Sequence, residues 1–320
     1  MDGYIPYGLP GDREMSGRPI DISVLLITYN HEPFIARAVE SVLNQATSRS
    51  FEVIVSEDAS TDRTLEIVKD LTGGDERVRL LVSKTNLHTN ETVARAIRVA
   101  RGRYICMLDG DDHWIVDDKL ERQADVLDAD SSLSACFHNA RIVRGEAMEP
   151  GEDIWTPATQ PMRIGMKEIW RGNPFATCAG MLRRSALVGL DGWYSQYDAM
   201  ITDWPLYILC AERGDLQFID EAVGAYRLHG GGAFSSLPGR DKLDVTASLY
   251  RRMDAGLHRR HHEYARAGAS DYFAEWAEEY AERGDRELAR RCAWYAIRAG
   301  GVGRSLSWRR WLRLGLRSLL

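Results

Sequence analysis

One segment, residues 103–114, constrains the fold more than any other part of this chain of 320 residues. It reads RYICMLDGDDHW, so an apolar run from Tyr104 to Leu108 ends in three carboxylates within four positions. A short apolar run bounded by glycines is typical of a fully buried central strand. The side chains of Asp109, Asp111 and Asp112 then follow the carboxyl end of that strand, where open α/β sheets bind their ligands.

Carboxylates this close together repel one another unless a cation lies among them. Hard oxygen ligands of this kind suit Mg²⁺ or Mn²⁺, and these ions commonly bridge to substrate phosphates. The segment therefore predicts a divalent metal, Mn²⁺ or Mg²⁺, beside Asp109 and Asp111. The alternative is a solvated acidic turn, which is a common feature of protein surfaces.

The surrounding chain alternates between strand and helix patterns. Further strands are expected at Ile20–Ile27, Phe51–Val55, Arg77–Val82 and Leu133–Val143. Between them, helices are expected from His31 to Leu43, from Ser60 or Thr61 as N-cap to Leu71, over Thr92–Ala100 and over Asp118–Leu127. Such alternation predicts an α/β protein with a parallel, doubly wound sheet and right-handed crossovers.

Polar residues follow the predicted strands, with Tyr29 and Asn30 after the first and Glu57 and Asp58 after the second. Because parallel strands end on the same edge of a sheet, we expect these residues to share one pocket with Asp109. Asp58 is suited to accept hydrogen bonds from a nucleobase. Its alternative role is to cap the next turn or helix.

A second acidic position opens a helix that ends near Gly214. Asp203 is expected as its N-cap, with Pro205 in the first turn. The positive end of a helix stabilises an ionised carboxylate, which is what a general base requires. Capping alone would also explain Asp203.

The segment from Tyr226 to Gly232 reads YRLHGGG and ends a predicted strand. His229 can complete a metal shell, Arg227 can clamp diphosphate oxygens, and the glycines suit a lid over a bound donor. The alternatives are a surface loop and an ordinary arginine ion pair.

Taken in order, these motifs resemble family-2 glycosyltransferases with the GT-A fold. The resemblance rests on TYN followed by Glu32, on EDASTDRT, ARGRYICMLDGDDHW and DWPL, and on YRLHGGG, and it covers about residues 20–235. It implies a Rossmann-like, mostly parallel sheet flanked by helices. It also implies transfer of a sugar with inversion, from a nucleotide-sugar that most commonly carries UDP, to a glycan, a lipid-linked or another hydroxyl acceptor.

The resemblance assigns roles to individual residues. Asp203 is implied as the catalytic base, and Asp109, Asp111 and His229 as metal ligands. Nucleotide-sugar binding is implied for Thr28, Tyr29, Asn30, Glu32, Asp58, Arg95, Asp109 and Arg227. The chain departs from the family pattern at Thr202, where many members have Glu, and at His88 and Ala94, where Gly and Asn are frequent.

Two other classes of protein compete with this interpretation. A sugar nucleotidyltransferase would carry a glycine-rich basic motif after the first strand, where this chain reads TYNHEP. A non-catalytic sugar-nucleotide-binding protein would have no need of Asp203 together with the acidic loop. Trp155 and Trp170, in the irregular stretch Gly145–Pro174, suit either sugar stacking or the core, and His138 is expected to be structural.

We expect a flexible leader at residues 1–18, with Met15 an alternative start, a GT-A domain at 19–235 and a helical region at 236–320. Residues 298–320 contain six Arg and no acid, and residues 305–320 suit either an anionic membrane surface or packing onto the protein's own domain or a partner. The net charge of −6 argues against nucleic-acid binding. Five scattered cysteines, no signal peptide and no membrane-spanning run predict a cytoplasmic protein, peripheral at the inner face of the membrane if the basic end binds lipid. The sequence predicts no oligomeric state.

Overall fold

The computed structural model describes residues 19–147, 149–190, 192–196, 201–232, 234 and 236–300, and the backbone of Tyr4–Pro6. The chain divides into two compact units. The first contains Met1–Ile164 and Pro174–Gly232, and the second contains Gly165–Asn173 and Ala233–Leu320. The helical unit therefore also takes in a short segment from within the expected catalytic domain. The basic segment 305–320 and most of the expected leader lie outside the described residues.

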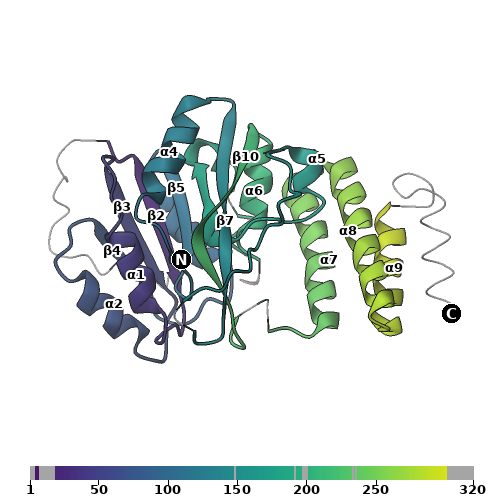
Figure 1. Cartoon of the computed structure of the whole chain (residues 1–320), viewed down its shortest axis with the longest axis horizontal. Helices are drawn as coiled ribbons and strands as arrows, with labels where there is room; N and C mark the ends of the chain where they lie inside the picture. Colours follow the sequence, from purple (N-terminus) through teal and green to yellow (C-terminus); the bar gives the residue numbers. More distant parts are fainter. Residues whose placement is uncertain are drawn as a thin grey trace. The chain divides into compact units, whose positions relative to one another are not determined.

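Within the described residues, the first unit is built on a ten-stranded sheet with the order β1-β4-β3-β2-β5-β9-β7-β10-β6, and β8 pairs with β10. Figure 1 labels the long strands of this sheet. The long strands run in one direction: β2 (Ile22–Thr28), β3 (Phe51–Glu57), β4 (Val78–Ser83), β5 (Tyr104–Asp109), β7 (Leu133–Arg144) and β10 (Asp215–Leu228). The short strands run against them: β1 (Tyr4–Pro6), β6 (His113–Trp114), β8 (Arg163–Ile164) and β9 (Gly180–Arg183). The mostly parallel sheet is confirmed, with β9 as an antiparallel strand between β5 and β7.

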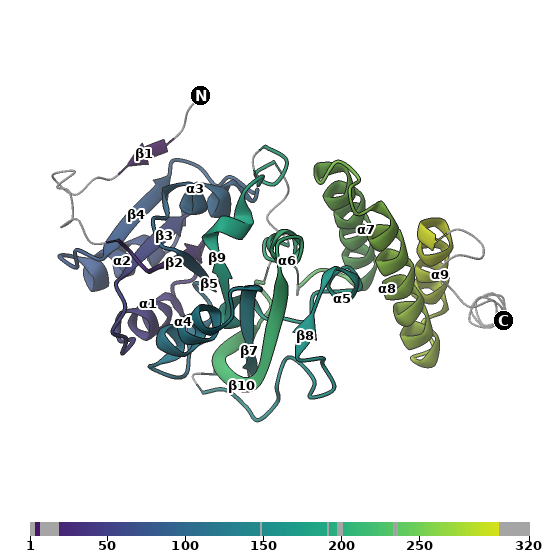
Figure 2. The ribbon, with the colours of Figure 1, turned by 90° about the horizontal axis from the view of Figure 1, so that it is seen from above.

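Helices cover both faces of this sheet. They are α1 (Ile35–Leu43), α2 (Thr64–Thr72), α3 (Glu91–Val99), α4 (Lys119–Ala129), α6 (Trp204–Ala211) and the 3₁₀ helices η1 (Thr177–Ala179) and η2 (Arg184–Leu187). Figure 2 shows α1 and α4 on one face and α3 and α6 on the other. The amphipathic spacing explains the docking of α1, because its buried residues are Ile35, Ala38, Val39 and Val42.

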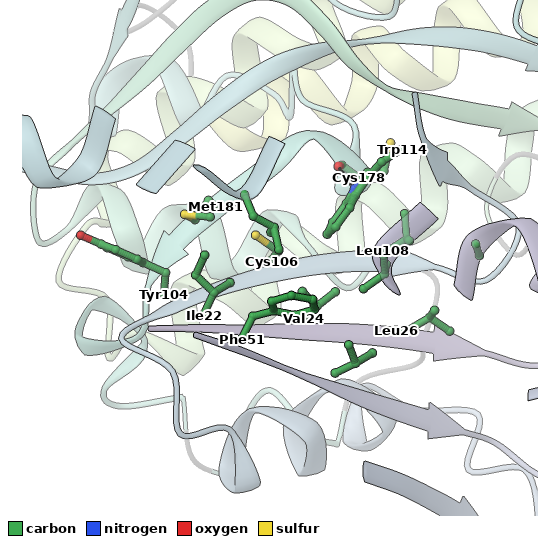
Figure 3. Close-up of a cluster of buried hydrophobic side chains, with 14 of the residues drawn as sticks. Ile22, Val24, Leu26, Phe51, Tyr104, Cys106, Leu108, Trp114, Cys178 and Met181 are labelled. Atoms are coloured by element: carbon green, nitrogen blue, oxygen red, sulfur yellow. Dashed lines mark hydrogen bonds between the residues drawn. The ribbon is translucent and has the colours of Figure 1, made fainter. Parts of the chain in front are cut away.

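The core beneath α1 and α4 comes from alternate residues of the central strands. Ile22, Val24 and Leu26 of β2 lie beside Tyr104, Cys106 and Leu108 of β5 (Figure 3). Both faces of these strands are buried, which explains why their sequences are continuous apolar runs rather than alternating ones.

Two predicted helix starts are wrong. The helix α1 begins at Ile35 and not at His31, whose carbonyl accepts from the Phe34 and Ile35 amides in the turn before the helix. The helix α2 begins at Thr64 and not after Ser60 or Thr61. The side chain of Ser60 instead accepts a hydrogen bond from the Asn30 amide, and Asp62 accepts from the amides of Glu32 and Thr64. These contacts hold residues 58–63 as a loop against the end of β2.

The second unit contains α5 (Met166–Ile169) and the long helices α7 (Gly239–Gly256), α8 (His262–Glu282) and α9 (Arg286–Gly300). The helices α8 and α9 are joined by a short turn that contains Gly284 at a φ of 80°. Trp170 is fully buried in this unit beside Tyr250, so its role is in the core and not in sugar stacking. No helix in the described part of the chain has the length and apolar composition needed to cross a bilayer.

Candidate active site

The acidic loop after β5 packs tightly against the end of β2. The Gly110 amide donates to the Ile27 carbonyl at 2.8 Å, and the Asp112 amide donates to the Asp109 carbonyl at 3.0 Å. A Cβ atom at Gly110 would lie 2.6 Å from Thr28 Oγ1 and 2.7 Å from His31 Nδ1. Glycine is therefore required between the two aspartates, because any side chain would push the loop away from β2.

The carboxylates of this loop have different surroundings. Asp111 Oδ2 lies 2.9 Å from His229 Nε2 and 3.8 Å from His31 Nε2, in a partly open position. Asp112 is only 2% exposed, and its Oδ1 accepts from the Arg227 amide at 2.8 Å. Asp111 is thus available to a ligand, while Asp112 joins the loop to β10.

The ionisation of the loop reflects burial and mutual repulsion. Burial raises the pKa of Asp109 well above its usual value, and the charges of Asp111 and Asp203 raise it further. Burial also acts to raise the pKa of Asp111, but His31 and the hydrogen bond with His229 lower it below its usual value. The influence of Asp203 on Asp109 places the two carboxylates in one electrostatic neighbourhood, although they are 94 positions apart in the sequence.

Asp203 is the N-cap of α6, as predicted. Its Oδ1 accepts from the Trp204 amide at 2.7 Å, and its Oδ2 accepts from Thr177 Oγ1 at 3.1 Å. The side chain is 8% exposed. Burial raises the pKa of Tyr194 and of Tyr207 well above the usual value, and the nearby negative charge of Asp203 adds to the effect in both.

Asp58 lies at the end of β3, next to the loop that follows β4. Its Oδ1 accepts from Ser83 Oγ at 2.8 Å, and both carboxylate oxygens lie 3.1 Å from the Leu87 amide nitrogen. The Asp58 amide donates to the Thr28 carbonyl at 3.0 Å, which joins this group to the end of β2. These contacts fix the orientation of Asp58, and they also supply the loop-capping role that the sequence left open.

Arg95 is buried beneath Asp58. Its guanidinium donates to the hydroxyls of Ser56 and Ser83 and to the carbonyls of Glu57 and Leu81. Ser83 contacts both Arg95 and Asp58, so Arg95 helps to fix the position of Asp58 through Ser83.

The remaining predicted nucleotide-binding residues lie at the end of β2. Thr28 is buried and its Oγ1 lies 3.2 Å from His31 Nδ1, whereas Tyr29 is 37% exposed. Asn30 has a φ of 53° and its Oδ1 accepts from the Thr61 amide, and Glu32 accepts from the Arg63 amide. Asn30 and Glu32 therefore join the loops after β2 and β3, and Tyr29 and Asn30 are both exposed.

Arg227 supports the acidic loop from β10. Its Nε donates to the Asp111 carbonyl at 2.8 Å, and one terminal nitrogen donates to the carbonyls of Gly145 and Ala147. The guanidinium also lies 4.3 Å above the centre of the Phe34 ring. Diphosphate binding by Arg227 stays a prediction.

The structure thus brings Asp109, Asp111, Asp203 and His229 together, with Asp58 and Arg95 at the adjoining strand ends. Sequence reasoning missed His31, which lies between Thr28 and Asp111, and Thr177, which contacts Asp203. The position of His31 directly after TYN was an available signal. Thr177 had none, because its contact spans 26 positions.

The chemistry of this group fits a divalent cation only in part. No three His, Cys, Asp or Glu side chains are arranged as a metal shell within the described ranges. Asp111 and His229 nevertheless form a close oxygen–nitrogen pair, with Asp109 beside them. Mg²⁺ and Mn²⁺ commonly complete their shells with water and substrate phosphate, so a small set of protein ligands suffices.

A separate recess of about 600 Å³ lies at the opposite edge of the sheet, before β2 and β5. Arg101, Arg103 and Arg184 line it. It is distinct from the acidic site, because β5 separates Arg103 from Asp109 along its whole length.

Solved structures with this arrangement of strands establish the fold. The structure of S. aureus TarS residues 1–349 in complex with UDP-GlcNAc aligns with a TM-score of 0.63 and 19% identity, covering 88% of this chain and 81% of that one. The mannosyltransferase PcManGT from Pyrobaculum calidifontis, in complex with GDP-Man and Mn²⁺, aligns with a TM-score of 0.55 and 17% identity, covering 94% and 80%. The protein is an α/β protein of the GT-A, Rossmann-like class.

The sequence comparisons then give the family. The model of glycosyl transferase family 2 matches residues 23–189, more than half of the chain, and the chain belongs to this family. An uncharacterized protein of Mycobacterium tuberculosis is 27% identical over 218 residues, 67% of this chain and 61% of that protein. The putative glycosyltransferase EpsE of Bacillus subtilis is 30% identical over 175 residues, 54% of this chain and 60% of that protein. The chain thus spans about three-fifths of the length of these relatives.

Proposed function

We propose that this protein is a metal-dependent glycosyltransferase that moves a sugar from a nucleoside-diphosphate sugar to an acceptor hydroxyl with inversion. The observation that carries the proposal is the proximity of Asp203, at the start of α6, to the acidic loop after β5. One carboxylate would remove a proton, and others would hold a cation that binds the anionic diphosphate of the donor. Membership of glycosyl transferase family 2 supports the same reaction class.

The reaction is a single displacement. Asp203 accepts the proton of the acceptor hydroxyl as the hydroxyl oxygen bonds to the anomeric carbon. The bond from that carbon to the diphosphate oxygen breaks on the opposite face, and the bonding pair leaves with the nucleoside diphosphate. The N-terminus of α6 stabilises the carboxylate, and the hydroxyl of Thr177 orients it.

Donor binding is assigned to the edge formed by β2, β3 and β4. Asp58, fixed by Ser83 and Leu87, accepts hydrogen bonds from the nucleobase, and the exposed ring of Tyr29 lines the same site. Asp111 and His229 would hold a divalent cation, and such an ion would supply stabilisation of the negative charge on the diphosphate. UDP is the proposed carrier, and TarS, a structural neighbour, has been solved with UDP-GlcNAc.

A lipid-linked acceptor is the favoured class. The Escherichia coli relative WfaP, named as a glucosyltransferase acting on a diphosphoundecaprenol-linked sugar, is 35% identical over 96 residues, 29% of this chain. A peripheral position at the cytoplasmic face of the membrane, held by residues 305–320, would suit such an acceptor. Liposome flotation of the full chain and of a chain ending at residue 304 tests this, because equal flotation removes the membrane role.

The decisive experiment combines a donor screen with one substitution. Nucleotide-sugars are screened with Mn²⁺ by thermal shift, and turnover is measured with the donor that stabilises most. Asp203→Asn should lower kcat by about 10²- to 10⁴-fold and leave nucleotide affinity unchanged, because only proton removal is lost. The exposed Asp70→Asn on α2 is the matched control. Normal turnover by Asp203→Asn refutes the assignment of the base.

A further inference from the structure

A lysine lies in the middle of the core of the first unit. Lys119, at the start of α4, is 0% exposed, although lysine is rarely fully buried unless paired. Its Nζ donates to Gln123 Oε1 at 2.6 Å and to the Gly180 carbonyl at 3.2 Å. It also lies 3.7 Å from Cys106 Sγ and 4.4 Å from the centre of the Trp114 ring.

These partners are neutral, and Lys119 has no carboxylate partner among the residues that the structure describes. Burying a cation without a counter-charge is costly, and an apolar residue of similar volume would pack here at a lower free-energy cost. Core packing therefore gives no reason for a lysine at this position.

Three consecutive backbone carbonyls receive side-chain hydrogen bonds at this place. Trp114 Nε1 donates to the Cys178 carbonyl at 2.9 Å, and Figure 3 shows the Trp114 ring beside Cys178. Gln123 Nε2 donates to the Ala179 carbonyl at 2.8 Å, and Lys119 Nζ donates to the Gly180 carbonyl. The backbone of residues 178–180, at the end of η1 and the start of β9, is thus held by one hydrogen bond to each carbonyl. The donors are side chains of β6 and α4.

The residue directly before this fixed segment is Thr177, whose hydroxyl contacts Asp203 Oδ2 at 3.1 Å. The opposite side of the segment is also closely packed, because a Cβ at Gly224 would lie 3.0 Å from Cys178 Sγ. The position of the Thr177 hydroxyl, and with it the orientation of the Asp203 carboxylate, therefore depends on the three donors.

We infer that Trp114, Lys119 and Gln123 are positioning residues that orient Asp203 through η1 and Thr177. The inference rests on the proposed function of Asp203 as the base. Among the described residues, their side-chain hydrogen bonds reach the carbonyls of residues 178–180, Cys106, His138 and one another, and none reaches the Asp58 end of the sheet. Loss of any one should therefore reduce kcat and leave nucleotide affinity unchanged.

The test is a double-mutant cycle between the two ends of this chain of contacts. Lys119→Met and Thr177→Val should each lower kcat about tenfold, through misorientation of the base. Their combination should also lower kcat about tenfold rather than about a hundredfold, because both act on the same carboxylate. The affinity for the nucleoside diphosphate, measured by calorimetry, should stay within about twofold of wild type in all three. The exposed Lys69→Met on α2 is the control and should behave as wild type.

Trp114→Phe is a milder variant for the case in which Lys119→Met does not fold. It keeps an aromatic ring near Lys119, loses the N–H group that contacts the Cys178 carbonyl, and has a smaller ring system than the indole. It should lower kcat severalfold with unchanged nucleotide affinity. Wild-type kcat in Lys119→Met or Trp114→Phe, or additive effects in the cycle, would overturn the inference.

Hydrogen exchange separates this inference from the proposed function. The amide of Ala179, bonded to the Ala176 carbonyl, and the amide of Trp204, bonded to Asp203, should exchange faster in Lys119→Met and Trp114→Phe. Amides of β2 and β3 should be unchanged. If the wild-type protein transfers no sugar, the proposed function is wrong. The exchange rates of these two amides would still show whether the three side chains position Asp203. Unchanged exchange at both amides refutes positioning even in an active enzyme.

Discussion

Replacing Gly110 by alanine tests the packing on which the acidic loop depends. The new methyl group would lie 2.6 Å from Thr28 Oγ1, 2.7 Å from His31 Nδ1 and 2.9 Å from Thr28 Cβ. Thr28 is a buried residue of β2, so its side chain has no room to yield, and its hydroxyl lies 3.2 Å from His31 Nδ1. Ordinary contact begins near 3.4 Å, so the loop has to move by about 0.8 Å.

Such a shift moves Asp109 and Asp111, which flank the glycine, by a similar amount. A displacement near 1 Å of a positioning group lowers turnover by about 10²-fold. Overpacking also costs about 1–3 kcal/mol of unfolding free energy. Gly110→Ala should therefore remain folded, with kcat reduced about a hundredfold and weaker Mn²⁺-dependent binding of the nucleoside diphosphate.

The assays are turnover with the identified donor, calorimetric binding with and without Mn²⁺, and urea unfolding. Gly172→Ala is the control, because a Cβ there would have its nearest neighbour at 3.7 Å, an ordinary contact. Wild-type turnover and metal-dependent binding by Gly110→Ala would show that the loop is not fixed against β2, and the reasoning from close packing would be wrong.

Three further predictions follow from single residues. Asp111→Asn should abolish the increase in nucleotide affinity that Mn²⁺ produces, and an unchanged calorimetric increase would exclude Asp111 as a ligand. Burial, with Lys119 and Arg122 nearby, lowers the pKa of His138 to about 4 from 6.5. The unfolded chain therefore binds the extra proton between those pH values, so stability falls as the pH drops, by about 2 kcal/mol from pH 7 to pH 5. His138→Asn should flatten this dependence in urea unfolding, and an equal slope in the variant would contradict the assignment. A Cβ at Gly268 would lie 2.0 Å from the Trp170 carbonyl oxygen, so Gly268→Ala should destabilise the helical unit by about 1–3 kcal/mol. Thermal unfolding measures this, and an unchanged melting temperature would refute the close packing of α5 on α8.

Local patterns were sufficient to predict the order of strands and helices. The buried strand before Asp109 and the cap at Asp203 appear where the sequence indicates, and the helix after Asn30 has the predicted apolar face but begins four residues later than predicted. The start of α2 was not predictable, because the side chains that would cap it locally bond to residues after β2, about 30 positions away. The antiparallel insertion of β9 was also missed, since a strand of four residues carries little periodicity.

In the candidate site too, the sequence predicts which residues are present, and the tertiary structure decides what each side chain contacts. The sequence placed Asp109, Asp111 and Asp112 in one loop but could not separate them. Tertiary contacts leave Asp111 facing His229 and turn Asp112 toward the backbone of β10. Likewise, the Arg227 side chain donates to the carbonyls of Asp111, Gly145 and Ala147, which all lie 80 or more positions away in the sequence.

The sequence by itself determined the α/β fold class, the family and the set of acidic residues, because strand periodicity, helix capping and short motifs are properties of neighbouring positions. Only the tertiary structure decided which carboxylates face a ligand, which residues hold them and how Asp203 is oriented. The physical reason is that these roles depend on contacts such as that between Asp111 and His229, 118 positions apart, which exist only once the sheet has formed.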